Sequence, residues 1–253
     1  MNLPPYVPFL GQPISLYTLS IGVACLCAFA LILWRSPARE KLMTVLLVAL
    51  IGALIVGRLY YVLIHLEYYV DQLAEVVDIR AGGSNWHGAV IGAVFTGNLV
   101  ALRRKIPLKV MWRAFSIALP IVTIGVAVGC LGAVCAYGQE VDTLAHHSSL
   151  FVSESRDIYG IIAPRYHTQL FIFALGVLCL LGSGFSGRWQ DQRQFGIPLL
   201  MMSVGMFIIG FFRGDAVTMI ANLRIDQLLD GWMILLSIIL ILRALKSASS
   251  VRS

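Results

Sequence analysis

Three side chains of this sequence, His87, Arg58 and Arg213, stand in or beside long apolar runs. A charged or titratable group is costly there and therefore usually has a function. Histidine exchanges its proton near neutral pH, so His87 could act as a general base. An arginine guanidinium matches a phosphate group through two parallel hydrogen bonds. Together the three residues predict proton transfer beside a bound anionic lipid headgroup.

Each of these side chains also has a simpler, structural interpretation. Arg58 could extend along its own apolar helix until the guanidinium reaches the membrane interface. Arg213 lies in FFRGD, where it could flank a membrane helix and pair with Asp215. His87 could be an interfacial histidine whose hydrogen bonds are satisfied by its neighbours. Both interpretations stay open on these residues alone.

Glycines surround the histidine in the stretch AGGSNWHGAVIGAV. Gly82, Gly83 and Gly88 permit unusual backbone angles and the close approach of a lipid headgroup or another helix. Gly88-x-x-x-Gly92 is also a common pattern for packing between membrane helices. The stretch therefore predicts close contact around His87, with either a ligand or a neighbouring helix.

The composition indicates a membrane protein. Of the 253 residues, 58% are hydrophobic and 13% are charged, whereas soluble domains are about half apolar and about a quarter charged. A spanning helix needs about 20 apolar residues, so a chain of this length leaves no room for a large soluble domain. We expect an all-α polytopic protein that forms a single integral membrane domain over residues 1–253.

About seven transmembrane helices are predicted from the apolar runs. These runs cover residues 14–34, 42–66, 87–102, 114–137, 168–185, 195–212 and 227–245. The first run is predicted to remain as a helix rather than to be cleaved as a signal peptide, because its positive charges follow it.

The positive charges favour one orientation. Most of the 19 lysines and arginines lie on one side of the predicted helices, and loops rich in Lys and Arg stay in the cytoplasm. We therefore expect the N-terminus outside and the C-terminus in the cytoplasm. The net charge of +6 is then an orientation signal, and no nucleic-acid partner is expected. Residues 67–86 and 138–167 become the long outer loops, where a site is often found.

Polar side chains gather at the outer ends of the runs. They are Tyr17, Arg58, Tyr60, Tyr61, His87, Tyr137, His167, Gln169, Arg213, Asp215, Asp226, Gln227 and Asp230. A channel or proton relay needs polar groups at several depths, and a transporter built from inverted repeats would show internal repetition. The pattern favours binding or catalysis at the outer surface instead.

Neither the cysteines nor the paired histidines indicate a metal site. The cysteines lie in or at the ends of apolar runs, at positions Cys25, Cys27, Cys130, Cys135 and Cys179. Each is predicted to be a small buried hydrophobe, and no disulfide is expected. His146 and His147 are predicted to lie in a solvated loop, because no carboxylate stands at ligand spacing. We expect neither a metal nor a cofactor.

Several stretches resemble, in the same order, motifs of the bacterial prolipoprotein diacylglyceryl transferase family. GGSNWHGAVIG, which contains His87, resembles the signature GG-x-S-x-HGG-x-x-G, and GRLYYVL resembles G-R-x-x-Y-V-L. YHTQLF is similar to H-P-x-Q-L-Y, and FFRGD is similar to F-x-R-x-P-D. Tyr17 resembles the family's first-span tyrosine and Gln227 its late glutamine. The resemblance covers nearly the whole chain.

The resemblance implies a multi-pass enzyme of the bacterial cytoplasmic (inner) membrane. The implied reaction transfers a diacylglyceryl group from phosphatidylglycerol to the lipobox cysteine of an exported prolipoprotein, and glycerol phosphate leaves. The thiol needs a base, and the leaving phosphate needs cations. The implied catalytic residues are His87, Arg58 and Arg213. The implied substrate-binding residues are Tyr17, Tyr61, Gly82, Gly83, Gly88, Gly138, His167, Gln169 and Gln227.

The largest departure from the family falls in the fourth apolar run. The family signature there is R-x-G-N-x-x-N-G-E-x-x-G, and this chain reads AVGCLGAVCAYG over residues 127–138. The arginine, the two asparagines and the glutamate are replaced by Ala127, Cys130, Ala133 and Cys135. Four polar groups expected to hold the headgroup are thus missing.

Other positions could compensate for this loss or add to it. Asp226, Asp230 and Tyr137 are candidates to replace the missing polar groups. Smaller departures are Ala89 for a glycine, and Thr168 and Gly214 for prolines.

Two alternatives to the implied enzyme remain. One is a catalytically silent or altered-substrate lipid-binding protein of the same fold, and the other is a small-solute transporter. Variants of His87 or Arg58 separate the three. An enzyme loses turnover, a lipid-binding scaffold keeps its partner, and a transporter changes flux.

Overall fold

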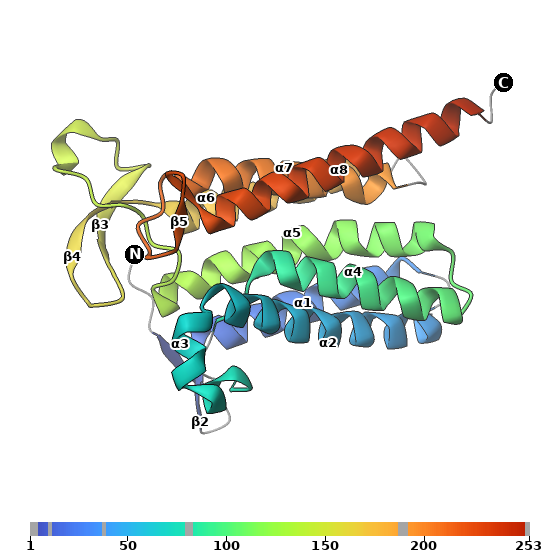
Figure 1. Cartoon of the computed structure of the whole chain (residues 1–253), viewed down its shortest axis with the longest axis horizontal. Coiled ribbons are helices and arrows are strands. Elements are labelled where there is room, and N and C mark those ends of the chain that lie inside the picture. The colour runs from blue at the N-terminus through green and yellow to red at the C-terminus, as the bar shows by residue number, and fades with distance from the viewer. Residues whose placement is uncertain (1–4, 10–11, 37–38, 79–82, 187–191, 251–253) are drawn as a thin grey trace. The chain divides into compact units, whose positions relative to one another are not determined.

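Most of the described chain is helical (Figure 1). The computed structural model describes residues 5–9, 12–36, 39–78, 83–186 and 192–250. Its long helices are α1 (Leu16–Trp34), α2 (Arg39–Ile64), α4 (Trp86–Arg103), α5 (Leu108–Ala133), α6 (Thr168–Ser186), α7 (Arg193–Gly210) and α8 (Ile225–Ser250). One of these helices lies on each apolar run of the sequence.

Five of the described helices, α1, α2, α5, α7 and α8, are long and apolar enough to cross a membrane. In α2, the side chains of Ile51, Ile55, Leu59 and Leu63 recur every fourth residue and are 50–65% exposed. Positions four apart lie on one side of a helix, so these residues form an apolar stripe suited to lipid. The prediction of an all-α polytopic membrane protein is confirmed. Seven spans and the orientation of the termini stay predictions.

The chain packs as two compact units. One is Phe29–Phe115, which contains α2 and α4, and the other combines Met1–Ala28 with Ser116–Ser253, which contains α6, α7 and α8. The boundaries fall inside the helices α1 and α5 and not in linkers. A single integral membrane domain over residues 1–253 therefore stays a prediction.

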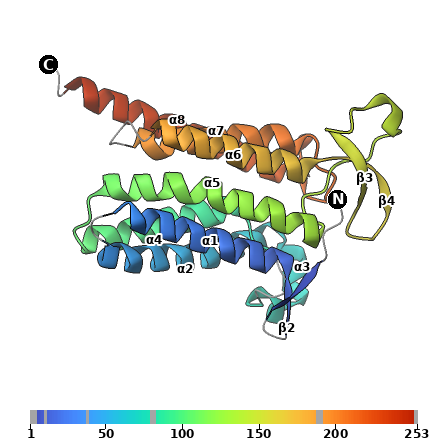
Figure 2. The same ribbon diagram turned by 180° about the vertical axis from the view of Figure 1, so that it is seen from behind.

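Glycines bring α2 and α4 into close contact, and both views show the two helices side by side (Figures 1 and 2). A Cβ added at Gly92 would collide with the backbone oxygen of Gly52, and one added at Gly88 would lie 3.1 Å from the Cα of Gly57. The Thr96 hydroxyl donates to the Gly92 carbonyl at 2.8 Å and so satisfies its polar atom. Gly88-x-x-x-Gly92 is thus a helix-packing pattern in this protein.

Replacing Gly92 with leucine is expected to destabilise the protein by about 1–3 kcal/mol or more, because α2 must move away from α4. The measurement is the melting temperature in detergent, followed by size-exclusion chromatography of the heated sample. Gly22→Leu is the matched control, since a Cβ at Gly22 meets nothing within 4 Å. Equal melting temperatures for the two variants would contradict the packing argument.

In the other unit, α6 packs against α7 and α7 against α8, as both views show (Figures 1 and 2). The first half of α1 lies against α5 through small residues. A Cβ at Gly125 would meet the Cβ of Ala24 at 2.5 Å, and one at Gly129 would meet the Tyr17 Cα at 2.9 Å. These contacts place Tyr17 beside the last turns of α5.

The described residues also form three antiparallel hairpins, one before α1, one before α6 and one before α8, and the sequence patterns did not predict them. The strands are β1 (Tyr6–Phe9), β2 (Gln12–Ser15), β3 (Val152–Arg156), β4 (Ile162–Tyr166), β5 (Met219–Ile220) and β6 (Leu223–Arg224). Short helical segments add α3 (Leu66–Asp71), η1 (Leu73–Val76) and η3 (Leu144–His146). Both predicted outer loops therefore contain regular structure.

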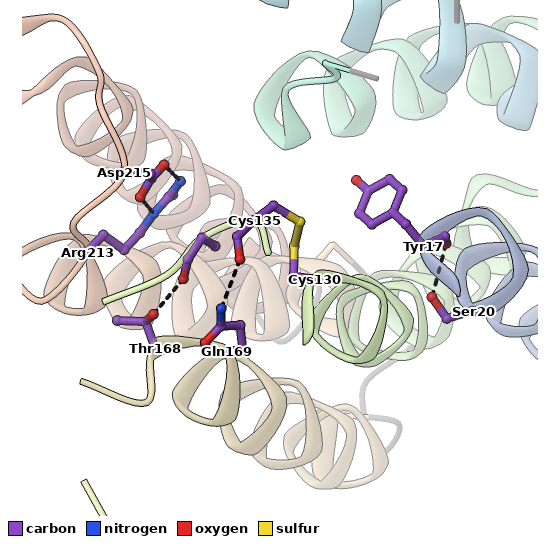
Figure 3. The surroundings of a disulfide bond; sticks show 9 residues. Tyr17, Ser20, Cys130, Cys135, Thr168, Gln169, Arg213 and Asp215 are labelled. Atoms are coloured by element: carbon purple, nitrogen blue, oxygen red, sulfur yellow. Dashed lines mark hydrogen bonds and ion pairs between the residues drawn. A yellow bond between two sulfur atoms is a disulfide. The ribbon is translucent and has the colours of Figure 1, made fainter. Parts of the chain in front are cut away.

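Cys130 and Cys135 form a disulfide (Figure 3), so the expectation of no disulfide was wrong. The fourth apolar run was expected to stay helical to residue 137, but α5 ends at Ala133. Val134 and Ala136 take positive φ angles of 55° and 51°, and the chain turns back. The two Cα atoms thus come within 4.6 Å, a separation that a disulfide can bridge. Among the other cysteines, Cys179 is buried as predicted and Cys25 is partly buried, but the prediction was wrong for Cys27, which is exposed.

Candidate active site

The predicted site residues fall into two groups, one in each unit. Arg58, Tyr61, Gly83, His87 and Gly88 belong to the unit Phe29–Phe115. The other group belongs to the second unit and contains Tyr17, Gly138, His167, Gln169, Arg213 and Gln227. Gly82 lies outside the described residues.

The Arg58 side chain is buried and bonded to backbone carbonyl groups. Its Nε donates to the carbonyl of Val76 at 3.1 Å and its Nη1 to that of Gly83 at 2.8 Å. Its Nη2 donates to the carbonyls of Glu75 and Asp78. Arg58 therefore bonds the described chain at residues 75–78 and again at Gly83, shortly before the start of α4.

Two aromatic rings flank the same guanidinium. The Arg58 Cζ lies 5.9 Å from the ring centre of Tyr61 and 5.3 Å from that of Tyr69. Gly83 takes a φ of 80°, and a Cβ there would collide with the Tyr61 ring. The predicted residues Arg58, Tyr61 and Gly83 are thus in direct contact.

His87 occupies the first turn of α4 and is only 1% exposed. Its Nδ1 lies 2.9 Å from the Oδ1 of Asn85, and its ring centre lies 4.1 Å from that of Trp86. Asn85 caps the helix, because the same Oδ1 accepts from the backbone N–H groups of His87 and Gly88. The histidine is therefore held in one orientation at a helix start.

Arg213 belongs to a cluster of alternating charges in the second unit. Its Nε donates to Asp215 Oδ1 at 2.9 Å, its Nη2 bonds the other carboxylate oxygen, and its Nη1 lies 3.6 Å from Asp226 Oδ2. Arg224 also contacts Asp215. Its Nη1 donates to the backbone carbonyl of Asp215 at 2.9 Å, and its Nη2 lies 3.2 Å from the Asp215 Oδ2. The structural interpretation of Arg213, pairing with Asp215, thus holds in this structure, and Nη1 is its least constrained donor.

Burial and the nearby carboxylates shift the pKa values of Arg213 and Arg224 in opposite directions. Burial lowers the pKa of Arg213, but Asp215, Asp226 and Asp230 more than reverse this, so its pKa lies above the ordinary value. Burial lowers the pKa of Arg224 below its ordinary value, although Asp215 opposes the shift. Both guanidinium groups stay charged at neutral pH, because an arginine does not deprotonate in proteins.

Gln227 connects this cluster to the end of α7. It is 1% exposed, its Oε1 accepts from the backbone N–H of Arg224 at 3.0 Å, and its Nε2 donates to the Phe207 carbonyl at 3.0 Å. A Cβ at Gly210 would lie 2.7 Å from the Gln227 Cγ. The Gln227 amide therefore holds the end of β6 against α7, and both its oxygen and its nitrogen make hydrogen bonds.

The start of α6 binds the turn that the disulfide closes (Figure 3). Gln169 Nε2 donates to the Cys135 carbonyl at 3.1 Å, and the Thr168 hydroxyl donates to the Ala136 carbonyl. The turn after α5 is thus held by a covalent bond and by two side chains of α6.

Gly138 and His167 are held through their backbones. Gly138 pairs with Arg213 in an isolated antiparallel bridge, and a Cβ there would collide with the Tyr166 carbonyl. The backbone N–H of His167 donates to the Phe151 carbonyl at 2.8 Å. The Gly138 bridge connects the turn after α5 directly to Arg213.

Within the part of the chain that the structure describes, no three His, Cys, Asp or Glu side chains are grouped so that they could hold a metal ion. His146 and His147 are both exposed, as predicted, although His146 ends the short helix η3 and does not lie in an irregular loop.

The comparison with known proteins decides the family. The family model described as prolipoprotein diacylglyceryl transferase matches residues 5–243. The chain belongs to the prolipoprotein diacylglyceryl transferase family. The phosphatidylglycerol–prolipoprotein diacylglyceryl transferases of Bacillus cereus strain 03BB102 and Bacillus thuringiensis subsp. konkukian strain 97-27 are each 32% identical over 212 residues. That of Bacillus cereus strain G9842 is 30% identical over 215 residues. All three alignments cover 81% of this chain and 76% of the relative.

Within this diacylglyceryl transferase family, the altered fourth run of the chain has a structural account. Ala127 is 1% exposed and Cys130 is 4% exposed, so both are packed in the interior of α5. Cys135 stands in the turn, where its disulfide and its carbonyl tie the turn to α5 and α6. At three of the four altered positions the polar groups are thus replaced by packing or by a covalent bond, whereas the fourth, Ala133, is exposed.

Thr168, which stands where the family motif H-P-x-Q has proline, also has a structural role. It is fully buried, and its hydroxyl makes a hydrogen bond that proline could not make. Thr168→Val is expected to cost about 1–3 kcal/mol, because the Ala136 carbonyl is left without this donor. The loss would appear as a melting temperature several degrees lower. The exposed Thr218→Val is the control, and an equally small change in both would contradict the role of the bond.

The sequence patterns missed two residues of these groups, Asn85 and Arg224. Asn85 could have been found, because Asn immediately before an apolar helix is a common N-cap. Arg224 carried no comparable signal, because only the β5–β6 hairpin brings it to Asp215. Ala221 and Asn222, both with positive φ, form the two-residue turn of that hairpin.

Proposed function

We propose that this protein transfers a diacylglyceryl group from phosphatidylglycerol to the cysteine thiol of a lipobox-containing prolipoprotein, in the bacterial cytoplasmic membrane. The observation that carries the proposal is the match to the transferase family over residues 5–243. The Bacillus relatives bear the name of this activity. Phosphatidylglycerol is a membrane lipid, which agrees with a chain of long apolar helices.

The reaction needs one base to accept the thiol proton and at least one cation to stabilise the leaving phosphate. The thiol sulfur attacks the diacylglyceryl carbon that carries the phosphate ester, a carbon–sulfur bond forms, and the carbon–oxygen bond breaks. Glycerol phosphate leaves with the electron pair of that bond. The thiol proton passes to the base, because the thiolate is the nucleophile. The product is a thioether-linked lipoprotein.

We assign the base to His87 and the stabilisation of the leaving phosphate to Arg213. The imidazole of His87 is oriented by Asn85, as a general base requires. Arg213 remains charged, and its Nη1 is 3.6 Å from a carboxylate oxygen of Asp226, which a phosphate oxygen could displace. The proposed substrate-binding residues are Tyr17, Tyr61, Gly82, Gly83, Gly88, Gly138, His167, Gln169 and Gln227. Arg58 acts through the backbone segment that it bonds.

We also propose seven spans, with the N-terminus outside and the C-terminus in the cytoplasm. The distribution of Lys and Arg favours this orientation. The Cys130–Cys135 disulfide supports it independently, since disulfides persist on the oxidising, outer side of a bacterial membrane. The end of α5 then faces outward, which is the side expected for an exported substrate.

The test uses the purified protein in nanodiscs that contain phosphatidylglycerol labelled in its acyl chains, together with a lipobox peptide. Transfer of label to the peptide cysteine, and none to a peptide with serine in its place, is expected. A Bacillus relative assayed alongside establishes that the conditions support the reaction. No transfer by this protein under those conditions would favour the silent or altered-substrate alternative.

A further inference from the structure

The Asn85 side chain determines which nitrogen of His87 carries the proton. Its Oδ1 accepts from the backbone N–H of His87 at 2.9 Å and from that of Gly88 at 3.4 Å. Turning the amide over would direct its NH2 group at two N–H donors, so the oxygen must occupy this position. The same oxygen lies 2.9 Å from the His87 Nδ1. An oxygen acceptor there requires a proton on Nδ1, and the lone pair of the neutral ring is then on Nε2.

Asn85 is itself held by α2. Its backbone N–H donates to the Gly57 carbonyl at 3.0 Å. A Cβ added at Gly57 would lie 2.7 Å from the Ser84 Oγ and 3.2 Å from the Asn85 carbonyl, so a larger residue would push the segment away. Glycine at this position therefore lets α2 bond directly to the cap of α4.

Arg58, the next residue of α2, holds the chain that precedes this cap. It bonds the carbonyls of Glu75, Val76, Asp78 and Gly83. These bonds use donors from Nε, Nη1 and Nη2, and the Tyr61 and Tyr69 rings flank the guanidinium. An arginine bonded in this way orders the backbone on either side of residues 79–82 and fixes the approach of the chain to Asn85.

We propose that Gly57, Arg58 and Asn85 are positioning residues that hold the neutral His87 ring as the Nδ1–H tautomer, the form in which Nε2 is the basic nitrogen. The proposal rests on the proposed function for the role of Nε2, but the tautomer itself does not depend on it. It assigns Arg58 to the orientation of the base and not to the binding of phosphate.

The first experiment is solid-state NMR of the full-length protein in phosphatidylglycerol vesicles with 15N-labelled histidine. The His87 signals are assigned by comparison with His87→Gln. We expect the Nδ1–H tautomer in the wild type and in Asn85→Asp, which keeps an oxygen acceptor. We expect a mixture of tautomers in Asn85→Ala. In the transfer assay, Asn85→Ala is expected to lower kcat about 10- to 100-fold with little change in KM, as loss of an orienting partner does.

Ser15→Ala is the matched control for the loss of a helix cap. Ser15 Oγ accepts from the Thr18 backbone N–H at the start of α1, so this variant also loses an N-cap bond. It should leave the His87 signals unchanged. An unchanged Nδ1–H signal in Asn85→Ala would overturn the proposal, and so would a changed tautomer with full transfer activity.

The second experiment follows hydrogen exchange in Arg58→Gln and does not require a folded Asn85 variant. Faster exchange at the amides of Asn85, His87 and Gly88, together with a lower kcat, is expected. Arg213→Ala, in the other unit, should lower transfer without changing exchange at these amides. Unchanged exchange in Arg58→Gln with a raised KM for phosphatidylglycerol would instead make Arg58 a phosphate ligand. If the wild type transfers nothing, the proposed function fails, while the tautomer and exchange results still decide this proposal.

Discussion

Replacing His87 with alanine is expected to lower the rate of diacylglyceryl transfer about 10²- to 10⁴-fold, the range that the loss of a general base produces. The loss should appear in kcat, because the base acts on the thiol proton after both substrates are bound. The measurement is the initial rate of label transfer to the lipobox peptide at saturating peptide. His87 is buried, so the variant must first be shown to melt near the wild-type temperature.

Two controls make the His87 result specific. His146→Ala removes an exposed histidine and should change the rate less than twofold. His87→Gln keeps a polar side chain of similar length but supplies no basic nitrogen, so it should be as slow as His87→Ala. Transfer by His87→Gln at more than a tenth of the wild-type rate would show that another group takes the thiol proton.

Replacing Arg213 with alanine is expected to lower kcat about 10²- to 10³-fold, because one donor to the developing charge is lost. Lysine keeps the charge but not the paired donors, so Arg213→Lys should recover only part of the rate. The comparison of kcat with KM for phosphatidylglycerol separates stabilisation of the leaving phosphate from simple binding of the lipid. Equal losses in the alanine and lysine variants would point to geometry rather than charge.

Among the described residues, removing Arg213 leaves Asp215 and Asp226 with Arg224 as their ion-pair partner, so a structural effect must be excluded. Arg156→Ala, which removes an exposed arginine of β3, is the control for a change in net charge. The double variant Arg213→Ala with Asp215→Asn removes one charge of each sign. If the double variant regains the wild-type rate, Arg213 serves only to neutralise Asp215 and does not act on the phosphate.

The sequence was sufficient to predict the helices and to single out polar side chains among them, because both depend on local pattern. Long apolar runs can form only helices in lipid, since each backbone polar group must be satisfied within its own segment. An arginine or histidine in such a run is conspicuous for the same reason. Arg58 and His87 could be singled out from the sequence alone, and both are buried in the same unit of the fold.

The partners of these residues could not be predicted in the same way, because they depend on turns. Arg58 bonds carbonyl groups, which every residue carries and which no sequence pattern distinguishes. The disulfide depends on two positive φ angles at Val134 and Ala136, neither of which is glycine. Arg224 reaches Asp215 only through a two-residue turn. Each of these contacts follows from the path of the chain, and apolar periodicity carries no information about that path.

The apolar stripe of Ile51, Ile55, Leu59 and Leu63 along α2 has a consequence for the concentration of the lipid substrate. A helix that presents such a face to lipid stays dissolved in the bilayer, and a phospholipid donor is a component of that solvent. The donor concentration is then a mole fraction in two dimensions, and diluting the vesicles in buffer does not change it. Turnover should follow the lipid composition of the membrane and the supply of exported acceptor, and should be independent of the volume in which the membranes are suspended.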